Sequence, residues 1–167
     1  YKTVMSDAAS GFTSVTYPFP VIRMADLYLM YAEALNEKGE DYATVLPWID
    51  MVRERSGLQG VKESWDQYVG NSKYATQTGL RQIIMQERRI ELAFEGHYFW
   101  DVRRWKTATT ELTQPLTGWK VRYGETDVDY YSENLVLVRD FTPKMYFWPI
   151  DIGELRKDPN LVQNYGW

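Results

Sequence analysis

Residues 85–105, MQERRIELAFEGHYFWDVRRW, hold the densest set of groups in the chain that could do chemistry. They include three glutamates at intervals of one helical turn, Glu87, Glu91 and Glu95, followed by the chain's single histidine, His97. Carboxylates at this spacing could bind a metal, and a pair of carboxylates could act as the acid and base of a glycosidase. The histidine could serve as a general base. Each of these three hypotheses requires further residues at defined positions.

The neighbouring residues do not meet these requirements. A di-iron helical bundle uses Glu-x-x-His, but Phe94 stands three residues before His97. A glycosidase places its carboxylates across an open cleft, whereas Glu87 and Glu91 lie one turn apart among apolar residues. No serine or cysteine nucleophile is close to His97 in the sequence, so a structural hydrogen-bonding role fits it better. We therefore expect no catalytic residue, no metal site and no cofactor.

The apolar spacing of this stretch predicts one long buried helix over residues 79–107. At about 100° per residue, apolar residues from both sides of Gly96 fall within one arc, so we expect the helix to continue through this glycine. Other apolar residues lie on other faces, which predicts that layers cover the helix on two sides. The residues of the arc are Leu80, Ile83, Phe94, Tyr98, Asp101, Val102 and Trp105.

Two acids of the stretch fall inside this apolar arc. An ionised carboxylate there must be paired or must change its pKa, so Glu87 and Glu91 each need a partner. Arg23 lies on the apolar stripe of an earlier helix, and we expect it to form a structural ion pair with Glu87 or Glu91 across the helix interface. The arginines of the stretch itself are expected to bind local acids, for example Arg88 with Glu91 at i, i+3.

Composition excludes several classes of partner. The chain has 167 residues, enough for about one domain, and its 19 basic and 23 acidic residues give a net charge of -4 with no basic stripe. Nucleic acid is therefore not an expected partner. No apolar run is long enough to span a bilayer, and the absence of cysteine excludes disulfides and thiolate metal sites. Aromatic residues, at 16%, are the unusual feature.

The first part of the chain predicts a helical hairpin over residues 21–57. Apolar residues at helical spacing indicate helices over 21–37 and 41–56, separated by a short turn at Gly39. Pro47 is expected to lie in the first turn of the second helix, where proline is tolerated. The hairpin resembles a tetratricopeptide unit, although its consensus tryptophan and closing proline are not met.

The rest of the chain predicts less regular structure. The polar stretch 59–79 is expected to be a loop with at most a short helix, and residues 118–140 predict a β-hairpin around a turn-rich centre. Asp151 is placed to cap a short helical turn that Asp158 and the following proline end. We expect residues 1–167 to form a single unit.

Three segments carry a further signal: FPVIRMADLYLMYAEALNE (19–37), LRQIIMQERRIELAFEGHYFWDVRRW (80–105) and FWPIDIGELRKDPNLVQNYGW (147–167). Together they resemble the signatures of the SusD/RagB family of nutrient-binding outer-membrane lipoproteins. The family has a Pro-aliphatic-Ile-Arg to Tyr-Ala-Glu-Ala helix, a Glu-Arg-x-x-Glu-Leu-x-x-Glu-Gly helix ending in Arg-Trp, and a C-terminal Gln-Asn-x-Gly-aromatic segment. Asp158 replaces the usual Asn, and Tyr165 a frequent proline. The shared order makes the match specific.

This resemblance implies a mainly α-helical, tetratricopeptide-like (SusD-like) architecture with long loops and a small β-hairpin. It implies that the chain is the C-terminal portion of a longer protein, whose signal peptide, N-terminal lipid anchor and earlier helical repeats lie outside it. It also implies a non-enzymatic lipoprotein at the outer membrane, on the cell surface, which captures oligosaccharides and passes them to a SusC-like TonB-dependent transporter. A helical-repeat scaffold that binds only protein is the alternative.

Sugar recognition requires flat rings that escape the core, flanked by hydrogen-bonding side chains. The three family signatures contribute no ligand-contacting residue, so the candidates lie in the segments between them. The first candidate set is Trp65, Tyr68, Asn71 and Tyr74, and the second is Trp119, Tyr123, Tyr130 and Tyr131. For each ring the alternative is packing against the helical scaffold or facing the transporter.

Overall fold

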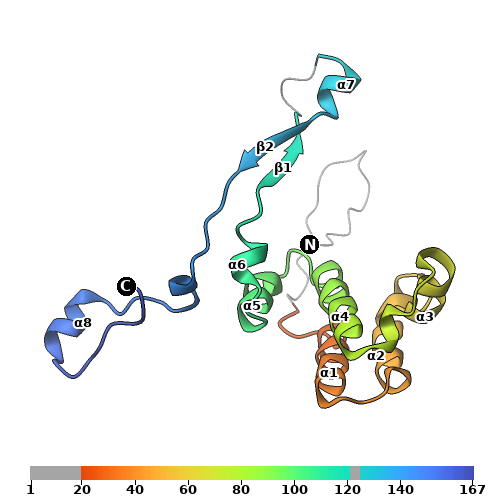
Figure 1. Cartoon of the computed structure of the whole chain (residues 1–167), viewed down its shortest axis with the longest axis horizontal. Helices are drawn as coiled ribbons and strands as arrows, with labels where there is room; N and C mark the ends of the chain where they lie inside the picture. Colours follow the sequence, from red (N-terminus) through yellow and green to blue (C-terminus); the bar gives the residue numbers. More distant parts are fainter. Residues whose placement is uncertain (1–19, 121–124) are drawn as a thin grey trace, which may run out of the picture. The chain divides into compact units, whose positions relative to one another are not determined.

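The computed structural model describes residues 20–120 and 125–167, and its chain divides into two compact units where the sequence predicted one. The first unit ends at Ala93 and the second runs from Phe94 to Trp167. The described residues form eight α-helices and one two-stranded sheet, which confirms the predicted mainly α fold class (Figure 1). None of the helices in these two described ranges is long and apolar enough to cross a bilayer.

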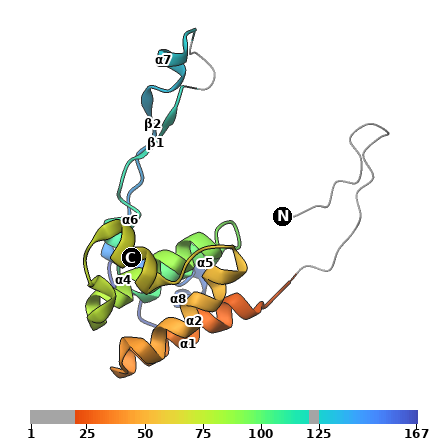
Figure 2. The same ribbon diagram turned by 90° about the vertical axis from the view of Figure 1, so that its right-hand side faces the viewer.

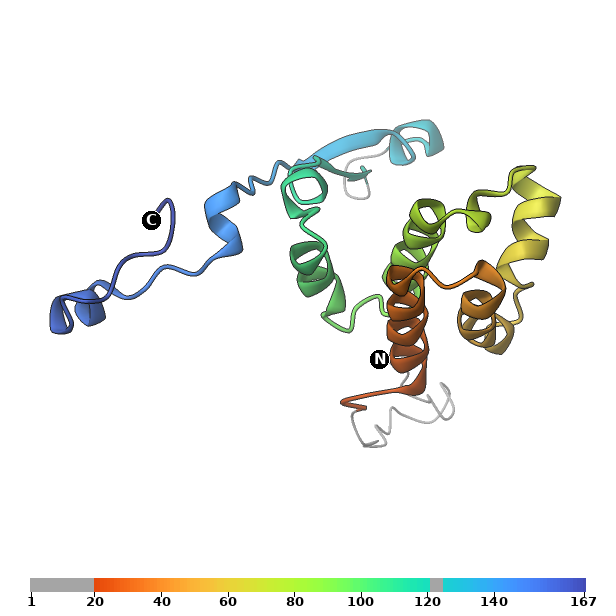
Figure 3. The same cartoon turned by 60° about the horizontal axis from the view of Figure 1, so that its bottom comes forward.

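Three helices make the body of the first unit. The helices α1 (Met24–Lys38), α2 (Tyr42–Arg55) and α4 (Gln77–Glu91) pack against one another (Figures 1 and 3). Gly39, with φ of 86°, ends α1 in left-handed backbone, and Asp41 caps α2 by accepting a backbone N–H bond. The predicted helical hairpin is thus formed by α1 and α2. The core includes Leu29, Ala32, Val45, Ile49, Leu80 and Ile84.

Pro47 lies in the second turn of α2, and the prediction that it would lie in the first turn is wrong. Proline removes the hydrogen bond to the carbonyl four residues earlier, here that of Ala43. Both residues are exposed. Because residues i and i+4 share a helix face, the freed carbonyl is on the solvent side of α2, where water can satisfy it.

The prediction of a single helix over residues 79–107 is also wrong. A turn separates α4 from α5 (His97–Arg104), and within it Phe94 and Gly96 have φ values of 66° and 83°. Left-handed backbone at two positions interrupts the i to i−4 hydrogen-bond ladder. The predicted apolar arc is only partly buried: Leu80 and Ile83 lie in the core of the first unit and Val102 in that of the second, whereas Phe94 is 97% exposed.

The segment 59–79, predicted to be a loop, contains a larger helical part than expected. The helix α3 (Val61–Ser64) continues into a π-helical turn (Trp65–Val69), and a 3-10 turn (Lys73–Ala75) precedes α4. The first residue of α3 is fully buried and donates its backbone N–H to the carboxylate of Asp50 at 2.7 Å. This tertiary anchor outweighs the weak helical propensity of the polar sequence.

The second unit contains the predicted β-hairpin. Strand β1 (Leu116–Trp119) pairs antiparallel with β2 (Glu133–Leu137), and Trp119 stands directly opposite Glu133. The segment between the strands includes the one-turn helix α7 (Asp127–Tyr130), which Figure 2 shows beyond the end of the ladder. The turn-rich centre predicted from the sequence therefore contains a helical turn.

A small core and one arginine join α5 to the C-terminal part of the second unit. The guanidinium carbon of Arg103 lies 5.1 Å from the ring centroid of Phe99 and 5.7 Å from those of Phe141 and Trp148. Arg103 also donates a hydrogen bond to the carbonyl of Tyr146 at 2.7 Å. Phe99 lies on α5 itself, and the cation–π contacts with the other two rings, Phe141 and Trp148, hold the helix against this segment. The buried residues of the core are Val102, Ala108 and Phe141.

Side-chain bonds to the backbone organise the C-terminal signature, residues 147–167. The amide of Gln163 accepts from the N–H of Ile150 at 2.8 Å and donates to its carbonyl at 2.9 Å. The indole of Trp167 donates to the carbonyl of Lys144 at 3.1 Å. These bonds satisfy backbone groups of the segment that lie outside its short helix. The remaining elements are α6 (Ala108–Glu111), a 3-10 turn (Pro143–Tyr146) and α8 (Ile152–Lys157).

Candidate functional site

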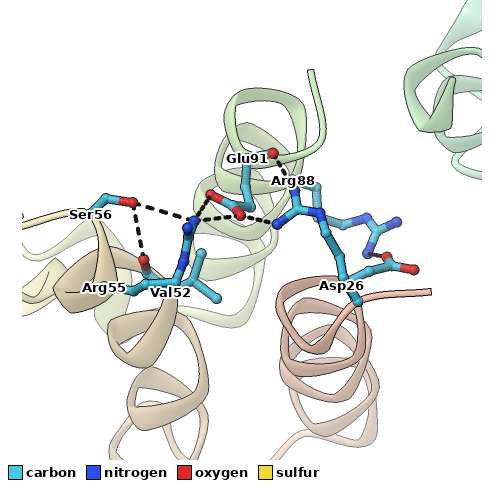
Figure 4. A network of polar contacts seen from close by, with 7 residues as sticks. Asp26, Val52, Arg55, Ser56, Arg88 and Glu91 are labelled. Atoms are coloured by element: carbon cyan, nitrogen blue, oxygen red, sulfur yellow. Dashed lines mark hydrogen bonds and ion pairs between the residues drawn. The ribbon is translucent and has the colours of Figure 1, made fainter. Parts of the chain in front are cut away.

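The charged residues at the end of α4 form a network that joins three helices (Figure 4). Glu91 accepts hydrogen bonds from Arg23, which precedes α1, and from Arg55 of α2 at 2.7 and 2.8 Å. The side chain of Glu91 is only 12% exposed. Of the two carboxylates considered for Arg23 from the sequence, the structure thus places Glu91 against it.

Glu87 has a different partner, Arg53 of α2. The same guanidinium donates to the carbonyl of Gln59 at 2.8 Å and to the hydroxyl of Ser64 at 3.0 Å, so it connects α2, α3 and α4. Burial is the largest cause that raises the pKa of the Glu87 carboxyl above its ordinary value of 4.5, and Arg53 lowers that pKa without reversing the direction. The sequence did not identify Arg53.

Arg88 is buried and donates to the carboxylate of Asp26 on α1 at 2.9 Å. The i, i+3 spacing that pointed to Glu91 did not predict this bond between helices. These ion pairs join elements of the helical scaffold and do not resemble an acid–base pair facing a substrate. In the part of the chain that the structure describes, no three His, Asp or Glu side chains gather in a group that could hold a metal ion.

The first candidate aromatic set belongs mostly to the scaffold. Tyr74 is buried and donates its hydroxyl to Asp66 at 2.8 Å. Trp65 is half-buried and packs against the core of the first unit. The side chain of Asn71 accepts a backbone N–H bond from two residues further along, which is typical of a turn. Tyr68 is the one ring of the set that is largely exposed, at 73%. This set therefore does not form an open surface of rings.

The second candidate set gathers at the hairpin. The ring centroid of Tyr131 lies 5.2 Å from that of Trp119, with the rings at 82°, and 4.9 Å from that of Tyr130, at 78°. Trp119 and Tyr131 are each 61% exposed. Tyr123, the fourth member, lies outside the described residues. The structure thus brings three of the four rings together in an aromatic corner.

This corner borders a hollow of about 590 Å³, which we call the hairpin hollow. Its lining residues are Thr117, Gly118, Trp119, Tyr131 and Glu133. The hydroxyl of Thr117 donates to Oε1 of Glu133 at 2.6 Å. Thr117, Trp119 and Glu133 share one face of the hairpin, because alternate residues of a strand and directly paired residues point the same way. Sequence reasoning missed Thr117 and Glu133, since their place depends on the register.

The hairpin hollow combines two kinds of surface. The faces of Trp119 and Tyr131 offer apolar area, and Glu133 and Thr117 offer hydrogen-bonding oxygens beside it. A ligand with an apolar face and hydroxyl groups at its edge matches this arrangement. The volume lies in the range typical of small-molecule sites, which is about 300–1,000 Å³.

The whole chain matches one protein family. The sequence profile described as the SusD family covers residues 1–167. The chain belongs to the SusD family. SusD-like protein P25 of Formosa agariphila is 39% identical over 144 residues, which are 86% of this chain and 23% of that protein. The family that the three signature segments indicated is thereby confirmed.

Solved structures agree with this assignment. A SusD-like protein from Bacteroides fragilis superposes with a TM-score of 0.70 at 29% identity and covers 90% of this chain and 28% of its own. A second protein from the same species, described as a SusD-like carbohydrate-binding protein, gives a TM-score of 0.67 at 32% identity over 86% of this chain and 28% of its own. The SusD-family chain thus spans about a quarter of the length of these relatives.

The buried pair of Arg88 and Asp26 can be tested by substitution. Arg88→Met leaves Asp26 buried without its partner, and we expect the free energy of unfolding to fall by about 3 kcal/mol. The control is Arg81→Met, because the Arg81–Glu37 pair is 37% and 45% exposed and should contribute less than about 1 kcal/mol. Urea unfolding monitored by circular dichroism measures both. Equal losses in the two variants would contradict the structural role of the buried pair.

The buried Glu87 predicts a pH dependence of stability. Because its folded pKa lies above 4.5, the folded state holds this proton more tightly than the unfolded chain does. The stability of the wild type relative to Glu87→Gln should therefore fall as the pH rises from 4.5 through the raised pKa. Urea unfolding at closely spaced pH values measures the difference, with Glu54→Gln on the exposed side of α2 as control. A difference that grows with pH would show that Arg53 outweighs burial.

Proposed function

We propose that the full-length protein captures oligosaccharides at the cell surface and that the hairpin hollow contacts one of their sugar units. Membership of the SusD family supports the first part, together with the similarity to a SusD-like carbohydrate-binding protein. The observation that carries the second part is the exposed, nearly perpendicular pair of Trp119 and Tyr131 beside Glu133.

The geometry of the ring pair sets how a sugar unit binds. In an edge-to-face pair, the edge of one ring covers part of one face of the other, and the remaining faces stay open. The apolar C–H side of a pyranose stacks on an open face of Trp119, with Tyr131 as a side wall. Hydroxyl groups at the edge of the sugar then reach Glu133 and Thr117. The pairing of β1 with β2 holds these groups in place before the ligand arrives, which lowers the entropic cost of binding.

The proposed role is capture and hand-over without cleavage. The lipid anchor precedes the residues of this chain and holds the full-length protein at the outer membrane. A SusC-like TonB-dependent transporter receives the oligosaccharide chemically unchanged. Glu87 and Glu91, the acids that first raised the possibility of glycoside hydrolysis, are bonded to arginines of the scaffold, which supports a binding role.

Removing a ring of the hollow should weaken glycan binding. We expect Trp119→Ala in the full-length protein to lower the affinity for its oligosaccharide about tenfold, a loss close to that of one aromatic contact. Trp100→Ala is the matched control, because Trp100 is 60% exposed on α5 and does not line the hollow. Glycan arrays followed by isothermal titration calorimetry give the affinities.

Three results would count against the proposal. Glycan binding that survives both Trp119→Ala and Tyr131→Ala unchanged would remove the hairpin hollow as a contact. Steady hydrolysis of an oligosaccharide by the pure full-length protein would replace binding with catalysis. Binding to other proteins with no glycan affinity would favour the interaction scaffold.

The hand-over step has its own test. We expect the tagged full-length protein to co-purify with a SusC-like transporter from detergent-solubilised outer membranes, identified by mass spectrometry. An unrelated outer-membrane lipoprotein with the same tag is the control. Recovery of the protein without any such transporter would contradict hand-over and would leave glycan capture standing.

A further inference from the structure

We infer that the hairpin hollow prefers sugar units that carry no negative charge over uronate and sulfated units. This inference rests on the proposed function, in which the hollow binds a sugar. Its basis is the carboxylate of Glu133, the one charged side chain among the described residues that line the hollow. Selection of this kind depends on an unfavourable contact with the wrong ligand as much as on favourable contacts with the right one.

The position of Glu133 makes it difficult for a bound sugar to avoid. Glu133 stands directly opposite Trp119 in the antiparallel ladder, and Cβ atoms of such pairs are about 4.5–5.5 Å apart. A sugar stacked on Trp119 therefore lies next to this carboxylate. Thr117 donates to Oε1 at 2.6 Å and so holds the carboxylate on the face of the hairpin that carries the ring.

A neutral sugar can form favourable hydrogen bonds with the carboxylate of Glu133. A carboxylate accepts hydrogen bonds at about four lone-pair positions, of which Thr117 uses one. Two neighbouring sugar hydroxyls can donate to the remaining positions, and hydrogen bonds to an ionised acceptor are roughly twice as strong as neutral ones. An amino sugar with a protonated nitrogen gains further from the attraction of opposite charges.

An anionic sugar binds less tightly for two reasons. A uronate carboxylate or a sulfate ester has no proton to donate at neutral pH, and it repels Glu133 within the screening distance of about 8 Å at physiological salt. In a solvent-exposed site, the repulsion between two unit charges in close contact lowers the affinity about fivefold.

The other described charges of the hairpin do not offset this repulsion. Glu125, Asp127 and Asp129 lie between the strands and have the same sign as Glu133. Lys120 is the one basic residue among residues 116–120 and 125–137, and it is not part of the lining of the hollow. Arg122 lies outside the described residues. Among the described residues that line the hollow, Glu133 therefore has no cationic neighbour.

The test uses the full-length protein on an array of neutral, amino, uronate and sulfated oligosaccharides. We expect binding to neutral or amino sugars that weakens about tenfold in Trp119→Ala. Glu133→Gln should reduce the discrimination between neutral and anionic glycans about fivefold, measured with methyl-esterified and free-acid oligogalacturonides as the matched pair of probes. Glu154→Gln on α8 removes the same charge outside the hairpin and should leave that discrimination unchanged.

The following results would overturn the inference. Binding to uronate or sulfated glycans that depends on Trp119 and is as tight as or tighter than binding to the matched neutral glycans would overturn the inference. Unchanged discrimination in Glu133→Gln, or an equal change in Glu154→Gln, would also overturn it. Glycan binding independent of both rings would overturn it and leave glycan capture intact. Failure to bind any glycan would overturn the proposed function and the inference together.

Discussion

The carboxylate of Glu91 joins the three helices of the first unit. Glu91 is the last residue of α4. Its carboxylate accepts hydrogen bonds from the guanidinium of Arg23, just before α1, and from that of Arg55, at the end of α2. A carboxylate that is only 12% exposed needs such partners, because an unpaired charge there would lower the free energy of unfolding by about 3–5 kcal/mol. The core and the buried pair of Arg88 and Asp26 depend on the same placement of α4 against α1 and α2.

The sequence was sufficient to show that these acids need charged partners. It identified only some of the partner residues. Their position on the apolar arc follows from local helical spacing, and the same spacing pointed to Arg23, which the structure places just before α1. The choice of Arg53 for Glu87 and of Asp26 for Arg88 depends on how α1, α2 and α4 pack, which no local pattern contains. Periodicity likewise did not reveal the break at Phe94 and Gly96, because two helices in phase give the same arc as one.

The candidate site shows a similar division. Ring type and position between the signatures were sufficient to select both aromatic sets, yet of their described rings only Trp119 and Tyr131 form an exposed pair. Tyr74 of the other set is buried, since the segment before α4 packs on the first core. Tyr131 reaches Trp119 because α7 and the strand register turn the chain back on itself. The same register places Glu133 beside Trp119, a relation between residues 14 positions apart that depends on pairing and not on local sequence.

The three signature segments and the hairpin hollow serve different purposes in this chain. Residues of the signatures make interior bonds: Arg23 and Glu91 between helices, Arg103 with three rings, and Gln163 with the backbone of Ile150. The hollow lies between the second and third signatures, on a two-stranded ladder whose residues are largely exposed. A change at Trp119 or Glu133 therefore alters the proposed ligand contact while the helical core keeps its packing. Such a separation lets one scaffold carry binding surfaces of different charge, because stability and ligand choice depend on different residues.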